Sequence, residues 1–225
     1  MMNDYELNIC KYKDAIILDK RNYMNYFCSL IRINHILLFA IIPSKDYNSK
    51  IIKLCVFLFI FSLNLTIEAL FYNEEVMHEI YEVEGVYIII KKISQIIYSS
   101  IISSLISIII KYFALSQKYV INQKNEKSDE NKELKYKKII NILYKKFILF
   151  FIISFLFLLF FWYYVSCFCA VFKNTQIHLI KDVLFGFGLS LTYPFISYLL
   201  SGIFRIYALR NEKKYIYKFS NLIVI

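Results

Sequence analysis

The densest group of side chains with ligand chemistry is the acidic segment from Glu74 to Glu82. On a helix, Glu74, His78 and Glu82 recur every four residues and share one face, while Glu75 and His78 form a Glu-x-x-His motif. Di-iron carboxylate bundles need two such motifs and further glutamates on facing helices, and this sequence has one. A divalent cation is one interpretation of the segment. A solvated acidic loop explains it better, and we expect no metal and no cofactor.

Glu68, Ser103 and Pro194 are the candidates for a transport function, because each lies inside an apolar block. An ionisable group in a membrane helix must face protein or water, so Glu68 is either a transport carboxylate or an interfacial one. Ser103 shares a helix face with Ser99 and Ser107, a spacing typical of close helix packing or of a hydrated pathway. Pro194 removes a backbone hydrogen bond and predicts a kink, which serves packing or gating. At all three positions we favour the structural interpretation.

An enzyme is not indicated by the remaining reactive residues. The three histidines, His35, His78 and His178, fall on different segments, and the sequence contains no Gly-rich phosphate loop, nucleophile elbow or HExxH motif. The five cysteines show neither a CxxC pair nor metal-ligand spacing, so we predict no disulfide framework. We therefore expect no catalytic residues.

The elements that must position these residues follow from composition. The chain has 225 residues, of which 59% are apolar and 20% charged, with only four Gly and two Pro. A soluble domain is about 45–50% apolar. Here the apolar residues form long uncharged blocks that a core of ordinary size cannot bury. Disorder is excluded as well, because it requires low hydrophobicity. The sequence predicts an all-α, polytopic helical membrane protein.

Four apolar blocks are long enough to span a bilayer, since a hydrocarbon core of about 30 Å needs roughly 20 helical residues. Helices are the only option, because open strands would leave backbone groups unpaired in lipid. The predicted spans are residues 54–72, 93–110, 147–172 and 183–204.

Lysine and arginine are distributed very unevenly between the segments that flank these spans. Of the 27 basic residues, 23 lie before the first span, between the second and third, or after the fourth. Only four lie in the two remaining loops, and the first of those is acidic. Because positive loops stay in the cytoplasm, both termini and the long middle loop are predicted to be cytosolic.

The segment Tyr23–Ile42 is ambiguous, because it has the length of a span but carries Arg32, Asn34 and His35 at its centre. A central Arg costs about 2.5–3.5 kcal/mol on insertion scales, so we expect an interfacial helix and not a fifth span. No cleaved signal peptide is expected at the start. The predicted organisation is an interfacial N-terminal segment, a membrane domain and a basic cytosolic tail, over residues 1–53, 54–204 and 205–225.

The Lys-rich loop 111–146 is expected to have three parts. Lys111–Ile121 is predicted to extend the second helix, Gln123–Asn131 to form a flexible tip, and Leu134–Lys146 to form a basic amphipathic helix that runs into the third span. Such a loop suits the anionic inner leaflet, so lipid and not nucleic acid is the expected partner.

Seven strings of the sequence together resemble an uncharacterised multi-pass segment that occurs in membrane proteins of unicellular eukaryotes, often at the C-terminal end of long chains. The resemblance covers nearly the whole chain. It implies a membrane protein that is a detached or truncated copy of a larger protein's tail, and it implies no activity, ligand or catalytic residue. The strings are DYELN, LDKRNY, DYNSKIIK, ALFYNEEVMHEIYEVEG, SQIIYSSIIS, FFWYYVSCFCAVFKNTQIHLIKD and GIFRIYALR.

The predicted function is that of a multi-pass integral membrane module with a structural, anchoring or assembly role. Its expected partners are the lipid bilayer and other membrane subunits. The alternative is a subunit of a transporter or ion channel that uses Glu68, Ser103 and Pro194.

Overall fold

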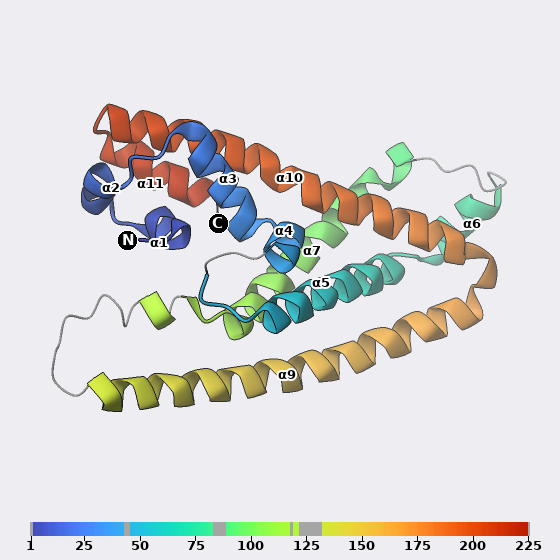
Figure 1. Ribbon diagram of the computed structural model, residues 1–225. Coiled ribbons are helices and arrows are strands. Elements are labelled where there is room, and N and C mark those ends of the chain that lie inside the picture. The colour runs from blue at the N-terminus through green and yellow to red at the C-terminus, as the bar shows by residue number, and fades with distance from the viewer. Residues whose placement is uncertain (1, 43–45, 83–88, 118, 122–131, 225) are drawn as a thin grey trace. The chain divides into compact units, whose positions relative to one another are not determined.

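The computed structural model describes every residue except 1, 43–45, 83–88, 118, 122–131 and 225 (Figure 1). The described residues are 87% helical and contain no strand, which confirms the all-α class. The helices are α1 (Asp4–Ile9), α2 (Tyr12–Leu18), α3 (Tyr23–Asn34), α4 (Ile36–Ile41), α5 (Lys50–Leu70), α6 (Glu74–Glu82), α7 (Ile89–Ala114), α9 (Lys132–Val171), α10 (Gln176–Arg210) and α11 (Lys214–Ile223).

The chain forms two compact units. The terminal unit consists of residues 1–53, 117–126 and 191–225, and the central unit consists of residues 54–116 and 127–190. The terminal unit thus contains both ends of the chain, α1 to α4, α11 and the second half of α10.

Four helices, α5, α7, α9 and α10, contain a stretch long and apolar enough to cross a membrane, as predicted. Each helix is longer than the apolar block that predicted it, because it continues into flanking polar residues. Helix α9 is the extreme case, with 40 residues and a length of about 60 Å. It includes Leu134–Lys146, so the prediction that this basic segment runs unbroken into the third span is confirmed.

One prediction about the helix ends was wrong. Helix α7 stops at Ala114, so Lys111–Ile121 is not one continuous extension. Lys146 Nζ donates to the carbonyl oxygen of Leu115 at 2.6 Å and satisfies a backbone group that would otherwise be unpaired at this helix end. The predicted flexible tip, Gln123–Asn131, lies outside the described residues.

The segment 23–42 is also not a single helix. It breaks at His35 into α3 and α4, and the extended backbone of His35 separates them. His35 Nε2 lies 2.9 Å from the carbonyl oxygen of Leu191 on α10. At about 1.5 Å per residue, the 12 residues of α3 reach roughly 18 Å, which is too short to cross a bilayer.

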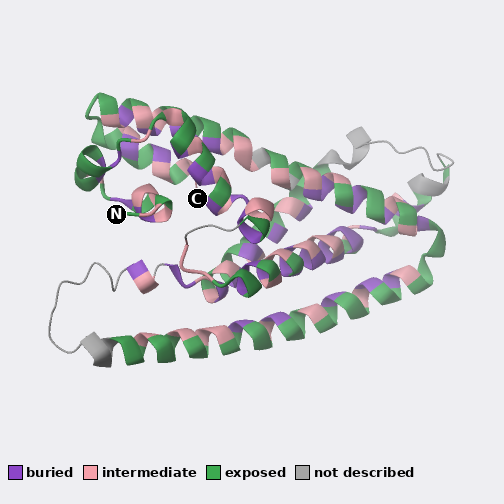
Figure 2. Ribbon diagram, in the orientation of Figure 1, coloured by how far each residue is buried: buried purple, intermediate pink, exposed green. Residues whose placement is uncertain are grey.

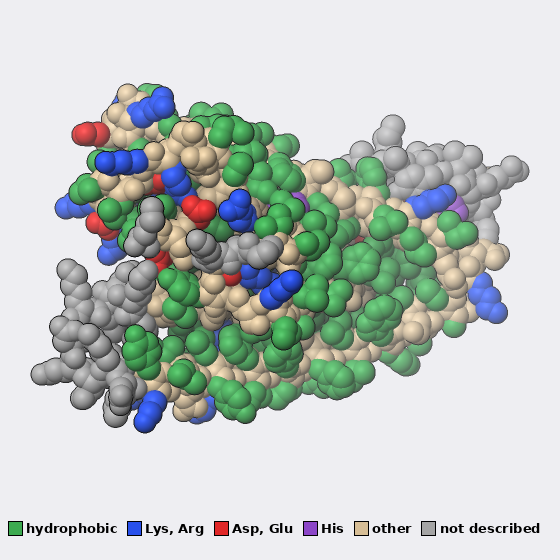
Figure 3. Space-filling model, viewed as in Figure 1, with side chains coloured by type: hydrophobic (Ala, Val, Ile, Leu, Met, Phe, Trp, Pro, Cys, Tyr) green, Lys and Arg blue, Asp and Glu red, His purple; other side chains and the backbone are tan. Residues whose placement is uncertain are grey.

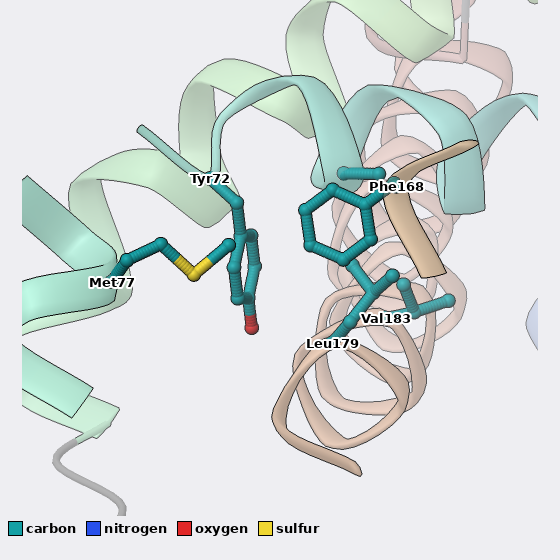
Figure 4. Close-up of a cluster of buried hydrophobic side chains, with 6 residues drawn as sticks. Tyr72, Met77, Phe168, Leu179 and Val183 are labelled. Carbon is teal, nitrogen blue, oxygen red and sulfur yellow. The ribbon is translucent and has the colours of Figure 1, made fainter. Parts of the chain in front are cut away.

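The core of the central unit forms around α5. In its most apolar window, 61% of the residues are buried, against 22% for α9, which Figure 2 shows as mostly exposed. Phe59 packs on Phe161 of α9, and Phe61 on Phe187 of α10, with ring centroids 5.6 and 5.4 Å apart. Figure 4 shows the cluster beyond the C-terminal end of α5, where Tyr72 meets side chains from α6, α9 and α10.

Large apolar side chains cover the outward faces of the long helices, and Figure 3 shows them along α9 on the visible side. Monomeric soluble proteins rarely expose an unbroken apolar patch of more than a few hundred Å². On α9 the exposed set includes Phe151, Ile152, Phe155, Leu156, Leu159, Phe160, Trp162 and Tyr163.

Candidate functional site

The guanidinium of Arg205, near the C-terminal end of α10, makes five hydrogen bonds to other parts of the chain. Its side chain is fully buried. Nη2 donates to Asp19 Oδ2 at 2.9 Å and to the carbonyl of Leu7 at 2.7 Å, and Nε donates to Asp19 Oδ2 at 3.2 Å. Nη1 donates to the carbonyl of Asn8 and to Oδ1 of Asn221. All five N–H donors of the guanidinium are therefore satisfied.

Two aromatic rings enclose the same guanidinium. Its central carbon lies 4.7 Å from the ring centroid of Tyr26 on α3 and 4.7 Å from that of Tyr217 on α11. A cation over an aromatic face gains about 2 kcal/mol when desolvated. Arg205 thus connects α10 to α3 and α11 as well as to the first 19 residues. We call Arg205, Asp19, Tyr26 and Tyr217 the arginine clamp.

Asp19 is the counter-charge of the clamp, and it also accepts from Arg21 at 2.7 Å. Burial alone would raise the pKa of Asp19, but the hydrogen bond and charge of Arg21, together with those of Arg205, outweigh it. The net result is a pKa below the ordinary value, so the carboxylate is ionised in the folded protein.

Further contacts hold the N-terminal residues of the chain against α10 and α11. Tyr217 donates its hydroxyl to the carbonyl of Cys10 at 2.7 Å, and burial raises the pKa of this phenol. Helix α1 begins with a capping box between Asn3 and Glu6. The clamp therefore lies among ordered helices and joins residues almost 200 positions apart in sequence.

Sequence reasoning missed the clamp, because Arg205 counted only as one of the basic residues after the fourth span. Two signals were present. Arg205 directly follows an uncharged block, so a partner for its charge was to be expected. In addition, the terminal segments contain several tyrosines and only a few acidic residues that could serve as partners. Nothing in the sequence, however, says which of these acids pairs with Arg205.

Glu68, the first transport candidate, lies on α5 and is only 3% exposed. Ser99 of α7 donates its hydroxyl to Oε1, and Gln95 donates to Oε2 at 3.3 Å. The carboxyl group is therefore used in a contact between the C-terminal end of α5 and the N-terminal part of α7.

Ser103, the second candidate, lies on the helix face that sequence spacing predicted. Ser99, Ser103 and Ser107 are all buried. Ser107 donates to the carbonyl of Ser103, whereas the hydroxyl of Ser103 has no hydrogen-bond partner within the described part of the chain. The buried hydroxyl of Ser154 on α9 likewise has none there. The serine face of α7 is therefore covered by other parts of the protein.

Pro194, the third candidate, lies inside α10 and is half-buried. Its carbonyl accepts from the hydroxyl of Ser197 at 3.2 Å. Pro194 belongs to the terminal unit, whereas Glu68 and Ser103 belong to the central unit.

The acidic segment forms α6 and not a loop, and Asn73 caps its first turn by accepting from the backbone N–H of Val76. Glu74, Glu75, His78 and Glu82 line a shallow, open depression, in which His78 Nδ1 lies 3.4 Å from Glu82. Among the described residues, no group of three or more His, Cys, Asp or Glu side chains is arranged to hold a metal ion.

Comparison of the chain with protein-family models, with curated proteins and with solved structures gives no match.

Proposed function

We propose that the protein is a multi-pass integral membrane module with a structural, anchoring or assembly role and no catalytic site. One observation carries the proposal: four helices are long and apolar enough to span a membrane, and their outward faces carry large apolar side chains. In water such surfaces would cost about 25 cal/mol per Å² of exposed apolar area, whereas lipid removes that cost.

Packing within the central unit supports successive crossings in alternating directions. The C-terminal end of α5 meets the N-terminal part of α7 at Glu68 and Ser99. The C-terminal end of α7 meets the basic part of α9 at Lys146. Tyr72, just after α5, meets Phe168 near the end of α9, with ring centroids 5.6 Å apart. These contacts fit helices that cross a bilayer up and down in turn.

The arginine clamp supports an even number of crossings, because it joins the two ends of the chain. The carbonyls of Leu7 and Asn8 accept from Arg205, and that of Cys10 accepts from Tyr217. Two chain ends in direct contact lie on one side of a membrane. Four spans meet this condition, and a fifth span at residues 23–42 would break it. The excess of basic residues in the same segments favours the cytosolic side.

A structural role is supported by the hydrogen bonds that buried charged side chains make to other groups of the chain. Arg205, Asp19 and Glu68 are used in contacts within the chain. The Lys-rich segment before the third span suits anionic lipids, and the exposed apolar helix faces suit lipid or further membrane subunits. We also propose, from the resemblance of its strings, that the chain corresponds to the C-terminal membrane segment of a longer protein.

Membrane extraction tests this proposal. Membranes from cells that express the chain are washed with alkaline carbonate and then with a mild detergent. An integral protein stays in the pellet after carbonate and is released only by detergent. Release by carbonate, or recovery from lysed cells without detergent, would contradict the proposal.

A transporter or channel subunit is the second candidate function, and the burial of Glu68 next to the serine face of α7 favours it. A carboxylate inside a membrane helix is expensive unless it faces protein, water or an ion. The test is ion and solute flux in vesicles that contain the purified chain or its Glu68→Gln variant. Flux that the substitution abolishes supports this candidate, and the absence of flux from both proteins rejects it.

A further inference from the structure

Helix α11 folds back along the C-terminal half of α10. Ser201 of α10 donates to the carbonyl of Ser220 at 2.9 Å. Tyr217, earlier in α11, lies against Arg205 and Ala208, later in α10. The two helices are therefore antiparallel, and Ser220 lies level with Ser201.

The opposite face of α11 is apolar and largely exposed. At 100° per residue, the buried Tyr217 and Ser220 lie on one side of the helix. Tyr215, Phe219 and Leu222 lie on the other side, and they are 87%, 51% and 66% exposed. Lys214 and Lys218 follow along one edge of that exposed face and are exposed too.

This face continues the outward surface of α10. Exposed apolar residues of α10 recur at helical spacing, and the rings of Phe204 and Phe219 join that stripe to α11 with centroids 5.3 Å apart. Phe204 is the last residue of the uncharged block predicted to span the membrane. The stripe consists of Ile196, Leu199, Leu200, Ile203 and Tyr207.

We propose that α11 is a membrane anchor whose exposed face, from Phe219 onward, enters the leaflet next to the chain ends. This inference rests on the proposed function. Ser220 lies level with Ser201, three residues inside the end of the block, which corresponds to a depth of about 5 Å.

The charges of α11 agree with this placement. Lys214 and Lys218 stand beside the apolar face, where their flexible stems reach lipid phosphates while Phe219 and Leu222 enter the acyl region. The clamp fixes α11 from the other side, because Tyr217 and Asn221 both contact Arg205. The bilayer therefore meets a preformed surface and need not order a free peptide.

Quenching of tryptophan fluorescence by brominated lipid tests the proposal. The chain has one tryptophan, Trp162, which is 56% exposed in the third span. Phe219→Trp and, as a matched control, Lys213→Trp at the start of α11 are each introduced together with Trp162→Phe. The proteins are reconstituted in phosphatidylcholine and phosphatidylserine vesicles, with and without bromine on the acyl chains.

Trp at position 219 is expected to lose a fraction of its fluorescence similar to that lost by native Trp162, and Trp at position 213 much less. Leu222→Trp, in the same background, gives a second reading from the same face. If positions 219 and 222 are unquenched while Trp162 is quenched, α11 does not lie in the bilayer and this inference is wrong. If Trp162 itself is unquenched, the proposed function fails instead.

Discussion

The substitution Asp19→Asn tests how much the arginine clamp contributes to holding the chain ends together. It keeps the size of the side chain and removes the negative charge that faces Arg205 and Arg21. Because the side chain of Arg205 is fully buried, its charge would then have no counter-ion. The expected result is opening of α1 and α2 away from α10 and α11.

The size of the effect follows from burial. Removing one partner of a buried ion pair costs about 3–5 kcal/mol. Asn still offers one oxygen, and the carbonyls of Leu7 and Asn8 remain as acceptors, so the lower end, about 3 kcal/mol, applies. At 1.4 kcal/mol per factor of ten, the open state becomes about 100-fold more populated.

The native thiol of Cys10 provides the assay. Cys10 is buried in a cluster with Ala15, Ala208 and Tyr217, so a bulky maleimide reaches it only when this contact opens. The other four cysteines are replaced by Ala, and the rate of labelling is measured on purified protein in micelles. The rate is expected to rise about 100-fold in Asp19→Asn, in proportion to the open population.

Asp14→Asn is the matched control, because Asp14 is an exposed acid of the same segment. It lies in the first turn of α2, where its loss costs about 0.3–1 kcal/mol and raises the rate only severalfold. Equal labelling rates for the wild type and Asp19→Asn would refute the reasoning that this carboxylate holds the clamp closed.

Two further predictions concern the same unit. Folding lowers the pKa of Asp19, so the stability that its carboxylate gives to the folded state is complete above the unfolded-state pKa of about 4. This stability is lost as the pH falls through the lower pKa of the folded state. Labelling of Cys10 with a dithiodipyridine, which reacts in acid, should therefore be slow at pH 5–8 and accelerate below about pH 4; a rate that is constant down to pH 2 contradicts this. At Gly202 an added Cβ would lie 2.8 Å from the ring of Tyr23, whereas at Gly188 it meets nothing within 4 Å. Gly202→Leu should lower stability in thermal unfolding by about 1–3 kcal/mol and Gly188→Leu should not; equal effects would show that Tyr23 moves aside without cost.

The all-α class and the four helices apolar enough to cross a membrane were predictable from the sequence because both depend on local composition. An uncharged block such as Phe147–Phe172 has one stable arrangement in lipid, and a run of lysines before it extends the same helix. The ends were less predictable. Helix α7 stops at Ala114, and the carbonyl just beyond this end accepts from Lys146 of another helix, a contact that no local pattern contains.

The polar contacts could not be predicted, because they join residues distant in sequence. Asp19 and Arg205 are 186 positions apart, and pairing them requires the folded positions of α2, α3 and α10. Glu68 was recognisable as a costly carboxylate in an apolar block, but its hydrogen bond to Ser99 depends on the register between α5 and α7. The sequence thus marks which residues need partners, and the fold decides which partners they find.

The central claim is that the chain crosses a membrane an even number of times, with both ends on the cytosolic side. Different epitope tags on the two ends, followed by protease treatment of sealed, right-side-out and inverted vesicles, test it most directly. We predict that both tags are cut in vesicles that expose the cytosolic face and that both are protected in the opposite ones. Protection of one tag under conditions that remove the other would contradict the account.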